Sequence, residues 1–367
     1  MITNPRILIL GKLPPPYMGP SVATKILLES PLRIRFTLFH VDTKAIRSLS
    51  ELGKWSMQKV LKNCSIYLKT FRTCLLMRPS LVLLPISQST IGFLKDSVFI
   101  LISKITFRKI ILQLRGSDFK RWYEARSSLM KFYIRFILKR TNGVIVLGNN
   151  LRYIFSDFFP EEKIFVCPNG GNFEVPKTDR RTGQVNILYL ANLNAAKGIE
   201  DVLQAIKILC AKGIKNFNVD VAGDWLSPEL QQSCIELVEK YSLPVSFHPT
   251  AAGEAKRKLF GSADIFVFTP REPEGHPWVI VEAMAAALPV LATDRGAIVE
   301  SVVDGENGFI VPLRSPEHIA VKLELLVNDE ALRKKMSAAS FRFYKEKFTE
   351  EKMVDNLERI FKTVIAG

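Results

Sequence analysis

The sequence predicts an α/β protein that contains two units, each with a parallel sheet. Its apolar runs are short and alternate with stretches of helical periodicity, which is typical of strands buried on both faces of a sheet. The chain has 367 residues, more than one hydrophobic core usually serves, and 47% of them are hydrophobic. We therefore expect two Rossmann-like domains, each with its own core.

The apolar runs fall into two series of expected strands. The first series comprises residues 6–10, 36–41, 81–84, 109–114 and 143–147, and the second comprises residues 185–190, 217–222, 245–247, 265–268 and 289–292. Between the two series, residues 168–183 are polar and rich in turn formers, as in a linker. We place the boundary near residue 175. Ligands of such sheets bind at the carboxyl ends of the strands.

One segment carries most of the chemical information. Residues 271–284 read Arg-Glu-Pro-Glu-Gly-His-Pro-Trp-Val-Ile-Val-Glu-Ala-Met and follow an expected strand, so Glu274 falls on a loop. Pro277 suits the first position of a helix, and Glu282 lies more than a turn into it. The N–H groups of residues 275–278 and the helix dipole favour a phosphate group. From the spacing alone, a loop charge and a solvated helix residue are the favoured interpretation.

The residues around this acid pair strengthen the functional interpretation. They include Leu-Pro-Val-Leu-Ala-Thr-Asp at 288–294, Gly296, Glu300 and Asp-Gly-Glu-Asn-Gly-Phe-Ile-Val-Pro at 304–312. The whole stretch 263–312 resembles the donor half of retaining glycosyltransferases of the family-four type (glycosyl transferases group 1). The resemblance implies that Glu274 contacts the transferred sugar and that Glu282 holds the nucleotide ribose.

The resemblance also implies the overall architecture, which is called GT-B. We expect residues 1–175 to form the domain that faces the acceptor and the membrane, and residues 176–345 to bind the nucleotide sugar. Residues 346–367 are expected to form a helix that crosses back to the first domain.

Lys197 is the next candidate site residue. With Gly198 it follows a strand and precedes a helix expected over residues 199–209, where a lysine can neutralise a diphosphate. Standing alone, a solvated lysine is the simpler interpretation, but the family has Lys-Gly here, reaching the nucleotide phosphates. The family often has Arg at the position of Asn192, which can still donate hydrogen bonds. Ala287 replaces the usual Gly, a change that we expect to cost little in a helix.

The first domain offers two weaker candidates. Gly19 closes a Pro-Pro-Tyr-Met-Gly loop similar to family loops near the donor phosphates, although a simple turn glycine fits equally well. Arg115 ends the fourth strand where the family commonly has a histidine near the reacting sugar. An arginine is no base, but it can stabilise a leaving diphosphate. The front-face retaining reaction that the family implies needs no dedicated nucleophile.

These considerations give a set of expected site residues. We expect Glu274, Arg115 and Lys197 to be catalytic. We expect donor binding by Gly19, Asn192, Lys197, Glu274, Gly275, His276, Pro277, Trp278 and Glu282. The sequence contains no Asp-x-Asp motif and no cluster of histidine, cysteine and carboxylate that would indicate a metal site. We therefore expect no cofactor and a metal-independent reaction.

The cysteines and apolar runs bear on the cellular compartment. The five cysteines are widely spaced and include no C-x-x-C pair, so we expect reduced thiols. The apolar run at residues 7–10 is too short for a signal peptide, and no run approaches the roughly 20 residues of a spanning helix. A cytoplasmic protein is therefore expected.

The charge is unevenly distributed. Residues 1–170 contain 27 Lys and Arg against 9 Asp and Glu, whereas the rest contains 24 against 27. Residues 55–78 and 130–140 interleave basic and aromatic side chains, and each taken singly is best interpreted as a core helix with a solvated stripe. Taken together, they favour docking to anionic lipid on the inner membrane face. Nucleic acid is the competing partner for a pI near 9.6, but no nucleic-acid-binding motif supports it.

The expected function is transfer of a hexose from a nucleoside diphosphate sugar to a lipid-linked or nascent cell-surface polysaccharide, such as O-antigen, capsule or exopolysaccharide. One alternative is a nucleotide-sugar epimerase of the same fold, which would need acid and base side chains. Of the four histidines only His276 falls near the expected site, where it would donate to the ligand or simply fill the turn. Another alternative is a non-catalytic protein that binds polyanions or membranes through its basic domain.

Overall fold

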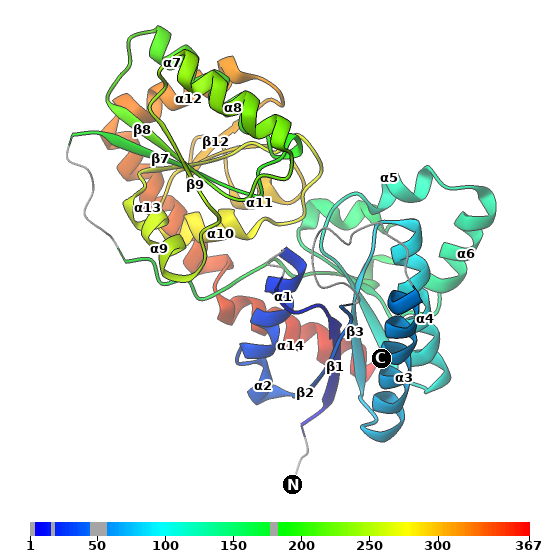
Figure 1. Ribbon diagram of the computed structural model, residues 1–367. Helices are drawn as coiled ribbons and strands as arrows, with labels where there is room; N and C mark the ends of the chain where they lie inside the picture. The colour runs from blue at the N-terminus through cyan, green and yellow to red at the C-terminus, as the bar shows by residue number, and fades with distance from the viewer. Residues whose placement is uncertain (1–3, 16–18, 45–56, 177–182) are drawn as a thin grey trace. The chain divides into compact units, whose positions relative to one another are not determined.

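The computed structural model describes residues 4–15, 19–44, 57–176 and 183–367 (Figure 1). The chain divides into two compact units. Unit 1 consists of Met1–Asn169 together with Glu350–Gly367, and unit 2 consists of Gly170–Thr349. The chain therefore leaves unit 1 once and returns to it with its last helix.

Unit 1 is built on a sheet of six parallel strands in the order β2-β1-β3-β4-β5-β6. The strands are β1 (Arg6–Gly11), β2 (Thr37–Asp42), β3 (Leu81–Ile86), β4 (Lys109–Leu114), β5 (Val144–Val146) and β6 (Ile164–Val166). The first five strands overlap the predicted ones. The sixth, β6, was not predicted.

Helices cover both faces of this sheet. They are α1 (Gly19–Glu29), α2 (Leu32–Arg35), α3 (Met57–Leu76), α4 (Thr90–Ile105), α5 (Phe119–Glu124), α6 (Ser128–Leu138) and α14 (Glu350–Ala366). Right-handed crossovers place α3, α4 and α6 on one face, because the chain then moves in one direction from β2 to β5. The return from β1 to β2 places α1 and α2 on the other face.

The C-terminal helix α14 packs within unit 1 against α2, β3 and β4. The ring of Phe361 meets Phe36 edge to face at 5.7 Å between centroids. Arg35 Nη1 lies 2.6 Å from Asp355 Oδ1 and also pairs with Glu358. The last helix is therefore attached by both apolar and ionic contacts.

Unit 2 has a second six-stranded parallel sheet in the order β12-β11-β10-β7-β8-β9. The strands are β7 (Val185–Leu190), β8 (Phe217–Ala222), β9 (Val245–His248), β10 (Ile265–Phe268), β11 (Val290–Thr293) and β12 (Gly308–Val311). The helices are α7 (Ile199–Ala211), α8 (Pro228–Lys240), α9 (Gly253–Ser262), α10 (Trp278–Ala285), α11 (Ile298–Ser301), α12 (Pro316–Asn328) and α13 (Glu330–Lys347). The strand order reverses between β7 and β10, which makes their carboxyl ends the topological switch point.

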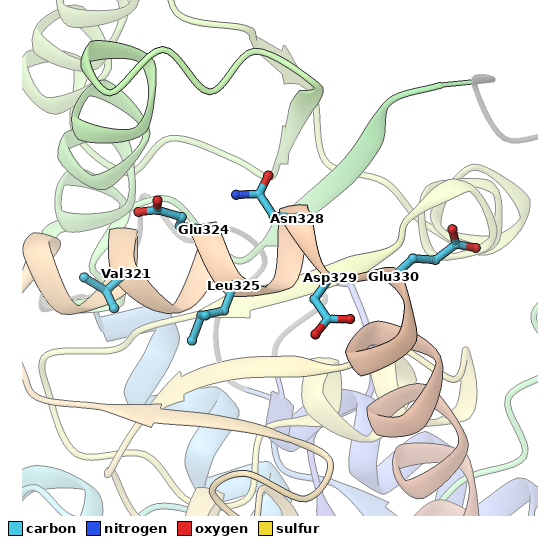
Figure 2. Close-up of a pocket in the computed structure, with 6 residues that line it drawn as sticks. All are labelled: Val321, Glu324, Leu325, Asn328, Asp329 and Glu330. Carbon is cyan, nitrogen blue, oxygen red and sulfur yellow. The ribbon is translucent and has the colours of Figure 1, made fainter.

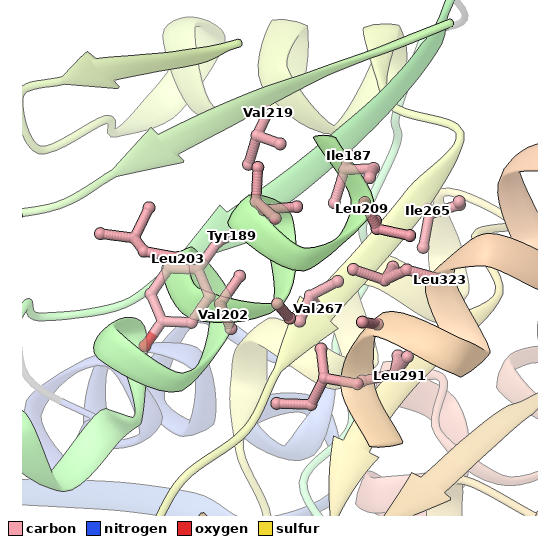
Figure 3. Close-up of a cluster of buried hydrophobic side chains, with 14 of the residues drawn as sticks. Ile187, Tyr189, Val202, Leu203, Leu209, Val219, Ile265, Val267, Leu291 and Leu323 are labelled. Carbon is pink, nitrogen blue, oxygen red and sulfur yellow. The ribbon is translucent and has the colours of Figure 1, made fainter. Parts of the chain in front are cut away.

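The core of unit 2 fixes this switch point. Figure 3 shows strand residues Ile187, Val267 and Leu291 in one cluster with helix residues Val202 and Leu323, all of them fully buried. Helices α7 and α12 thus share one face of the sheet and contact each other. Because α7 is packed along its length, its N-terminus is held beside the ends of β7 and β10.

Two expectations about local structure were wrong. Pro277 is the N-cap of α10, with extended backbone angles, and Trp278 is the first helical residue. Helix α10 ends at Ala285, so Ala287 lies beyond the helix, with φ at +55° in the left-handed region. A Cβ is unfavourable in that conformation, so we expect alanine at this position to cost stability relative to glycine.

Candidate active site

Two loops meet at the switch point of unit 2. The loop after β7 ends in the short 3-10 turn Ala195–Lys197 before α7, and the loop after β10 runs to Pro277. The amide of Arg271 donates to the carbonyl of Ala196 at 2.8 Å. Gly198 has φ at +79°, and a Cβ there would lie 2.0 Å from the carbonyl oxygen of Thr269. Glycine is therefore required for the two loops to approach this closely.

This approach brings together two of the predicted site residues. Lys197 Nζ forms an ion pair with Glu274 Oε1, although the residues are 77 positions apart. Their side chains are only 25% and 16% exposed. The hydroxyl of Tyr189 donates to the carbonyl of Lys197 at 2.7 Å and thereby fixes the turn Ala195–Lys197 to strand β7. The lysine charge is thus balanced by a carboxylate that an anionic ligand would have to displace.

Glu282 lies on α10, as predicted, and has a partner that was not predicted. Lys256 Nζ of α9 lies 2.7 Å from Glu282 Oε1 and 2.6 Å from Oε2. Only Oε1 accepts a well-aligned hydrogen bond, and within the described residues Oε2 is buried without one. Burial raises the pKa of Glu282, and the charge of Lys256 opposes that rise. Oε2 is therefore a buried carboxylate oxygen whose charge is balanced by the nearby Lys256 ammonium.

Arg271 fastens the β10 loop to the first turn of α7. Its guanidinium contacts both oxygens of Asp201 at 2.7 Å and Glu200 at 2.6 Å, and its side chain is 16% exposed. The hydrogen bonds that Arg271 donates to Asp201 raise the pKa of Arg271, so it stays charged. Sequence reasoning missed this residue. The neighbouring acids Glu200 and Asp201, which follow Lys197-Gly198, could have indicated it, because two adjacent carboxylates are stabilised by a nearby cation.

The loop before α10 is held by close backbone packing. Gly296 has φ at +58°, and a Cβ there would lie 1.8 Å from the carbonyl oxygen of Glu274. The amide of Ala297 donates to the carbonyl of Gly275 at 2.8 Å. Trp278 packs against Phe173 edge to face at 6.3 Å. As the first residue of α10, Trp278 has no intrahelical acceptor for its N–H, which leaves a donor at the positive end of the helix.

His276 points into the core of unit 2 and not to the loop surface. It is 3% exposed, its Nε2 lies 2.6 Å from Ser301 Oγ, and its ring packs on Phe348 at 5.0 Å. Burial lowers the pKa of His276 to about 3, so the imidazole is neutral at ordinary pH. These contacts support the turn-filling interpretation of this residue. Asn192, by contrast, is exposed on the loop after β7.

The remaining predicted residues belong to unit 1. Arg115 follows β4, and within the described residues its buried Nε has no hydrogen-bond partner. Burial lowers the pKa of Arg115 to about 10, which leaves it charged at neutral pH. Gly19 is exposed as the first residue of α1. The tyrosine of the Pro-Pro-Tyr-Met-Gly loop lies outside the described residues.

A surface hollow of about 480 Å³ lies elsewhere on unit 2 (Figure 2). It is at the junction of α12 and α13 and presents three carboxylates. Each of them already has a partner in the protein: Glu324 pairs with Lys212, Glu330 pairs with Lys334, and Asp329 caps α13. An acidic, open hollow away from the strand ends does not suit a nucleoside diphosphate.

Two features are absent from the described ranges, a metal-binding cluster and a membrane-spanning helix. No group of three or more His, Cys, Asp or Glu side chains there is arranged to hold a metal ion. Nor does any helix in the described part of the chain combine the length and hydropathy needed to cross a bilayer. All five cysteines are free thiols, of which Cys64 is exposed.

Comparisons with known proteins bear on the family and the fold of this chain. Residues 172–343 match the sequence profile of the family described as "Glycosyl transferases group 1". A Staphylococcus aureus protein, the capsular polysaccharide biosynthesis glycosyltransferase CapM, is 26% identical over 266 residues. That alignment covers 64% of this chain and 66% of CapM, so the chain spans slightly less than two thirds of this relative.

Solved structures show the same fold across the chain. A glycosyltransferase from Rickettsia africae superposes with a TM-score of 0.75 at 19% identity, covering 99% of each chain. Anabaena HepE in complex with UDP and glucose gives 0.75 at 17% identity, covering 98% of this chain and all of HepE. Unit 2, which carries the paired lysines and glutamates, therefore belongs to the glycosyl transferases group 1 family, and the chain has the two-domain GT-B fold.

Proposed function

We propose that this protein is a retaining, metal-independent glycosyltransferase that moves a hexose from a nucleoside diphosphate sugar to a lipid-linked or nascent polysaccharide. The observation that carries this proposal is the pair of lysine–glutamate contacts, Lys197 with Glu274 and Lys256 with Glu282, beside the N-terminus of α10. CapM, named for capsular polysaccharide biosynthesis, supports a surface polysaccharide as the product, of the capsule, exopolysaccharide or O-antigen type.

Each group of the site has a role in donor binding. The diphosphate competes with Glu274 for the Lys197 ammonium, and the N–H donors around Gly275 and Trp278 share its charge. Glu274 is then free to accept hydrogen bonds from the sugar hydroxyls. The buried Oε2 of Glu282 accepts from a ribose hydroxyl. Asn192 adds a neutral donor at the rim.

The transfer follows from this placement. The bond between the anomeric carbon and the phosphate oxygen breaks, and the acceptor oxygen forms a new bond on the same face of the sugar. The acceptor proton passes to the leaving phosphate oxygen, so no side chain has to act as base. Lys197 and the positive end of α10 stabilise the charge that grows on the diphosphate. Arg115, a buried cation in unit 1, is assigned to the same leaving group, and Gly19 to close backbone approach.

The proposed location is the inner face of a membrane, with the protein peripheral and otherwise cytoplasmic. The basic excess of residues 1–170 supports this placement, because a lipid-linked acceptor is presented at an anionic surface. An epimerase is less favoured, because the histidine nearest the site, His276, is buried and engaged with Ser301.

A panel of nucleoside diphosphate sugars tests the donor site. We expect one donor to raise the melting temperature of the wild-type protein and to be hydrolysed slowly without acceptor. The Glu274→Ala variant should bind nucleotide but lose hydrolysis, and Glu282→Ala should lose nucleotide affinity by roughly tenfold or more. The control is Glu272→Ala, an exposed carboxylate on the same loop. If no nucleotide sugar raises the melting temperature and none is hydrolysed, the proposal is contradicted. Formation of an epimeric nucleotide sugar would indicate the epimerase instead.

A further inference from the structure

Helix α3 carries an apolar stripe that faces away from the core. The stripe has the alternating spacing of four and three residues, and its members are Met57, Leu61, Cys64, Leu68, Phe71 and Leu75. Leu61 is 65% exposed and Leu68 is 51% exposed. The opposite side, with Ile66, Thr70 and Cys74, is the buried one. Large apolar side chains in a continuous exposed row mark an interaction surface.

Helix α4 repeats this arrangement. Its outer stripe is entirely apolar and consists of Ile91, Leu94, Val98, Leu101 and Ile105. Ile91 is 71% exposed and Ile105 is 68% exposed, while Phe93 and Ile100 face the core. Just beyond the helix, Phe107 is 91% exposed. Helix α4 is therefore apolar on both its inner and its outer side.

Helix α6 adds three more exposed apolar residues on one side. Leu129 is 80%, Phe132 69% and Phe136 41% exposed, and the two phenylalanine rings stack at 6.4 Å. The Arg140 guanidinium lies over the Phe136 ring at 3.3 Å. Apolar side chains bordered by a cation in this way are typical of helices that lie at a lipid interface.

The three helices are neighbours. Tyr67 of α3 meets Phe99 of α4 at 4.9 Å between ring centroids. Ser97 of α4 and Tyr133 of α6 share a hydrogen bond of 2.7 Å. Because all three cover the same face of the sheet, their outer stripes combine into one surface, which we call the α3–α4–α6 face (Figure 1).

The charge of this face is of one sign. Helices α3 and α6 contain no Asp or Glu, and the single acid of α4, Asp96, is only 9% exposed and accepts from the Ser87 amide. The exposed cations of these helices include Lys62, Lys69, Arg72, Lys95 and Lys104. On the opposite side of the sheet, α14 carries four carboxylates. Helix α14 also contains three cations, Lys352, Arg359 and Lys362, so it is the net positive charge that is concentrated on the surface where the apolar stripes are exposed.

We infer that the α3–α4–α6 face inserts its apolar side chains into an anionic bilayer while its lysines and arginines contact the lipid headgroups. A second copy of the chain is a poorer occupant, because two such faces would oppose cations without any carboxylate between them. Nucleic acid would satisfy the cations but leave the leucine and phenylalanine stripes exposed to water. This inference deepens the proposed membrane location, and it is tested without donor or acceptor.

Vesicle binding provides the test. Vesicles of phosphatidylcholine with phosphatidylglycerol should bind the protein, and vesicles of phosphatidylcholine alone should bind it far more weakly. The triple variant Ile91→Ser/Leu129→Ser/Phe132→Ser should partition at least tenfold more weakly, since all three side chains are exposed and their loss leaves the core intact. The matched control is Ile34→Ser, which is 74% exposed on α2, on the other side of the same sheet.

A second measurement reports insertion directly. Cys64 lies on the outer stripe of α3 and is the exposed one of the five thiols. Anionic vesicles should slow its alkylation severalfold, and part of this protection should persist at about 1 M salt, where the Debye length is only about 3 Å. Equal vesicle binding by the triple variant and the Ile34→Ser control would overturn the inference. So would protection of Cys64 by self-association or duplex DNA and not by vesicles.

Discussion

Replacing Lys256 with alanine isolates the energetics of the buried pair on α9 and α10. The ammonium of Lys256 lies within 2.7 Å of both oxygens of Glu282, whose side chain is 12% exposed, while that of Lys256 is 25% exposed. Removing one partner of a buried pair costs about 3–5 kcal/mol, because the remaining charge is left uncompensated. Since Lys256 is partly exposed, we expect about 2–3 kcal/mol at neutral pH.

The sign of the pH dependence follows from the direction of the pKa shift. Burial raises the pKa of Glu282 in the folded state above the unfolded value of roughly 4.3. The folded protein therefore binds more protons in the window above that value, so this group's contribution to stability falls as the pH rises through it. Lys256→Ala raises the folded pKa further and extends the window upward. The variant should thus be nearly as stable as the wild type at low pH and lose most at neutral pH.

Urea unfolding of both proteins at pH 4.5 and pH 7.5 measures this difference. The control is Lys258→Ala on the same helix, whose pair with Glu254 is exposed at 65% and 72% and should change stability by less than about 0.5 kcal/mol. The double variant Lys256→Ala/Glu282→Gln should recover much of the loss, because no buried charge remains. A loss in Lys256→Ala that is equal at both pH values, or larger at pH 4.5, would refute the electrostatic explanation.

Three further changes test the loops around the site. Ala287→Gly should stabilise the protein by about 0.5–1 kcal/mol in thermal or urea unfolding, because φ at this position is +55°; a loss of stability would contradict the strain argument. Gly296→Ala should abolish nucleotide binding and lower the melting temperature, since its Cβ would lie 1.8 Å from the Glu274 carbonyl oxygen; unchanged calorimetric binding would show that the loop does not need this packing. Arg271→Lys should keep the fold but weaken nucleotide affinity at least severalfold, because a lysine cannot bridge Asp201 and Glu200 together. Wild-type affinity in this variant would show that nucleotide binding does not depend on the contacts of Arg271 with α7.

Strands were the most predictable elements of this fold. Residues 109–114, 185–190, 217–222 and 265–268 were predicted with the bounds that the structure shows, because each is rich in the apolar residues typical of buried parallel strands. The short strands β6 and β12 were not predicted. Strand order was not predictable from these runs, since it depends on pairing between distant residues. For the same reason the switch point between β7 and β10 was not predictable.

The candidate site was predicted in part for a related reason. Glu274 and Lys197 stand out because each lies in a recognisable motif between a strand and a helix, and Glu282 stands out because it lies on the helix of the same motif as Glu274. Their partners are distant in sequence: Lys256 is 26 residues before Glu282, and Arg271 is 70 residues after Asp201. A surface lysine and a loop arginine have no local pattern that reveals such pairing. The burial of His276 was equally invisible, because it depends on Ser301 and Phe348.

Local composition and periodicity were enough to predict the fold class, the position of the motifs expected to bind the donor and the concentration of positive charge in the first half of the chain. Folding does not alter these properties. Which face of each helix is buried depends on its contacts in the folded protein. The apolar stripe of α3 has a spacing that equally suits a core-facing side, yet the chain buries Ile66, Thr70 and Cys74 instead. A period of 3.6 residues shows that a helix has an apolar side, whereas the neighbouring strands and helices determine whether that side meets the core or remains exposed.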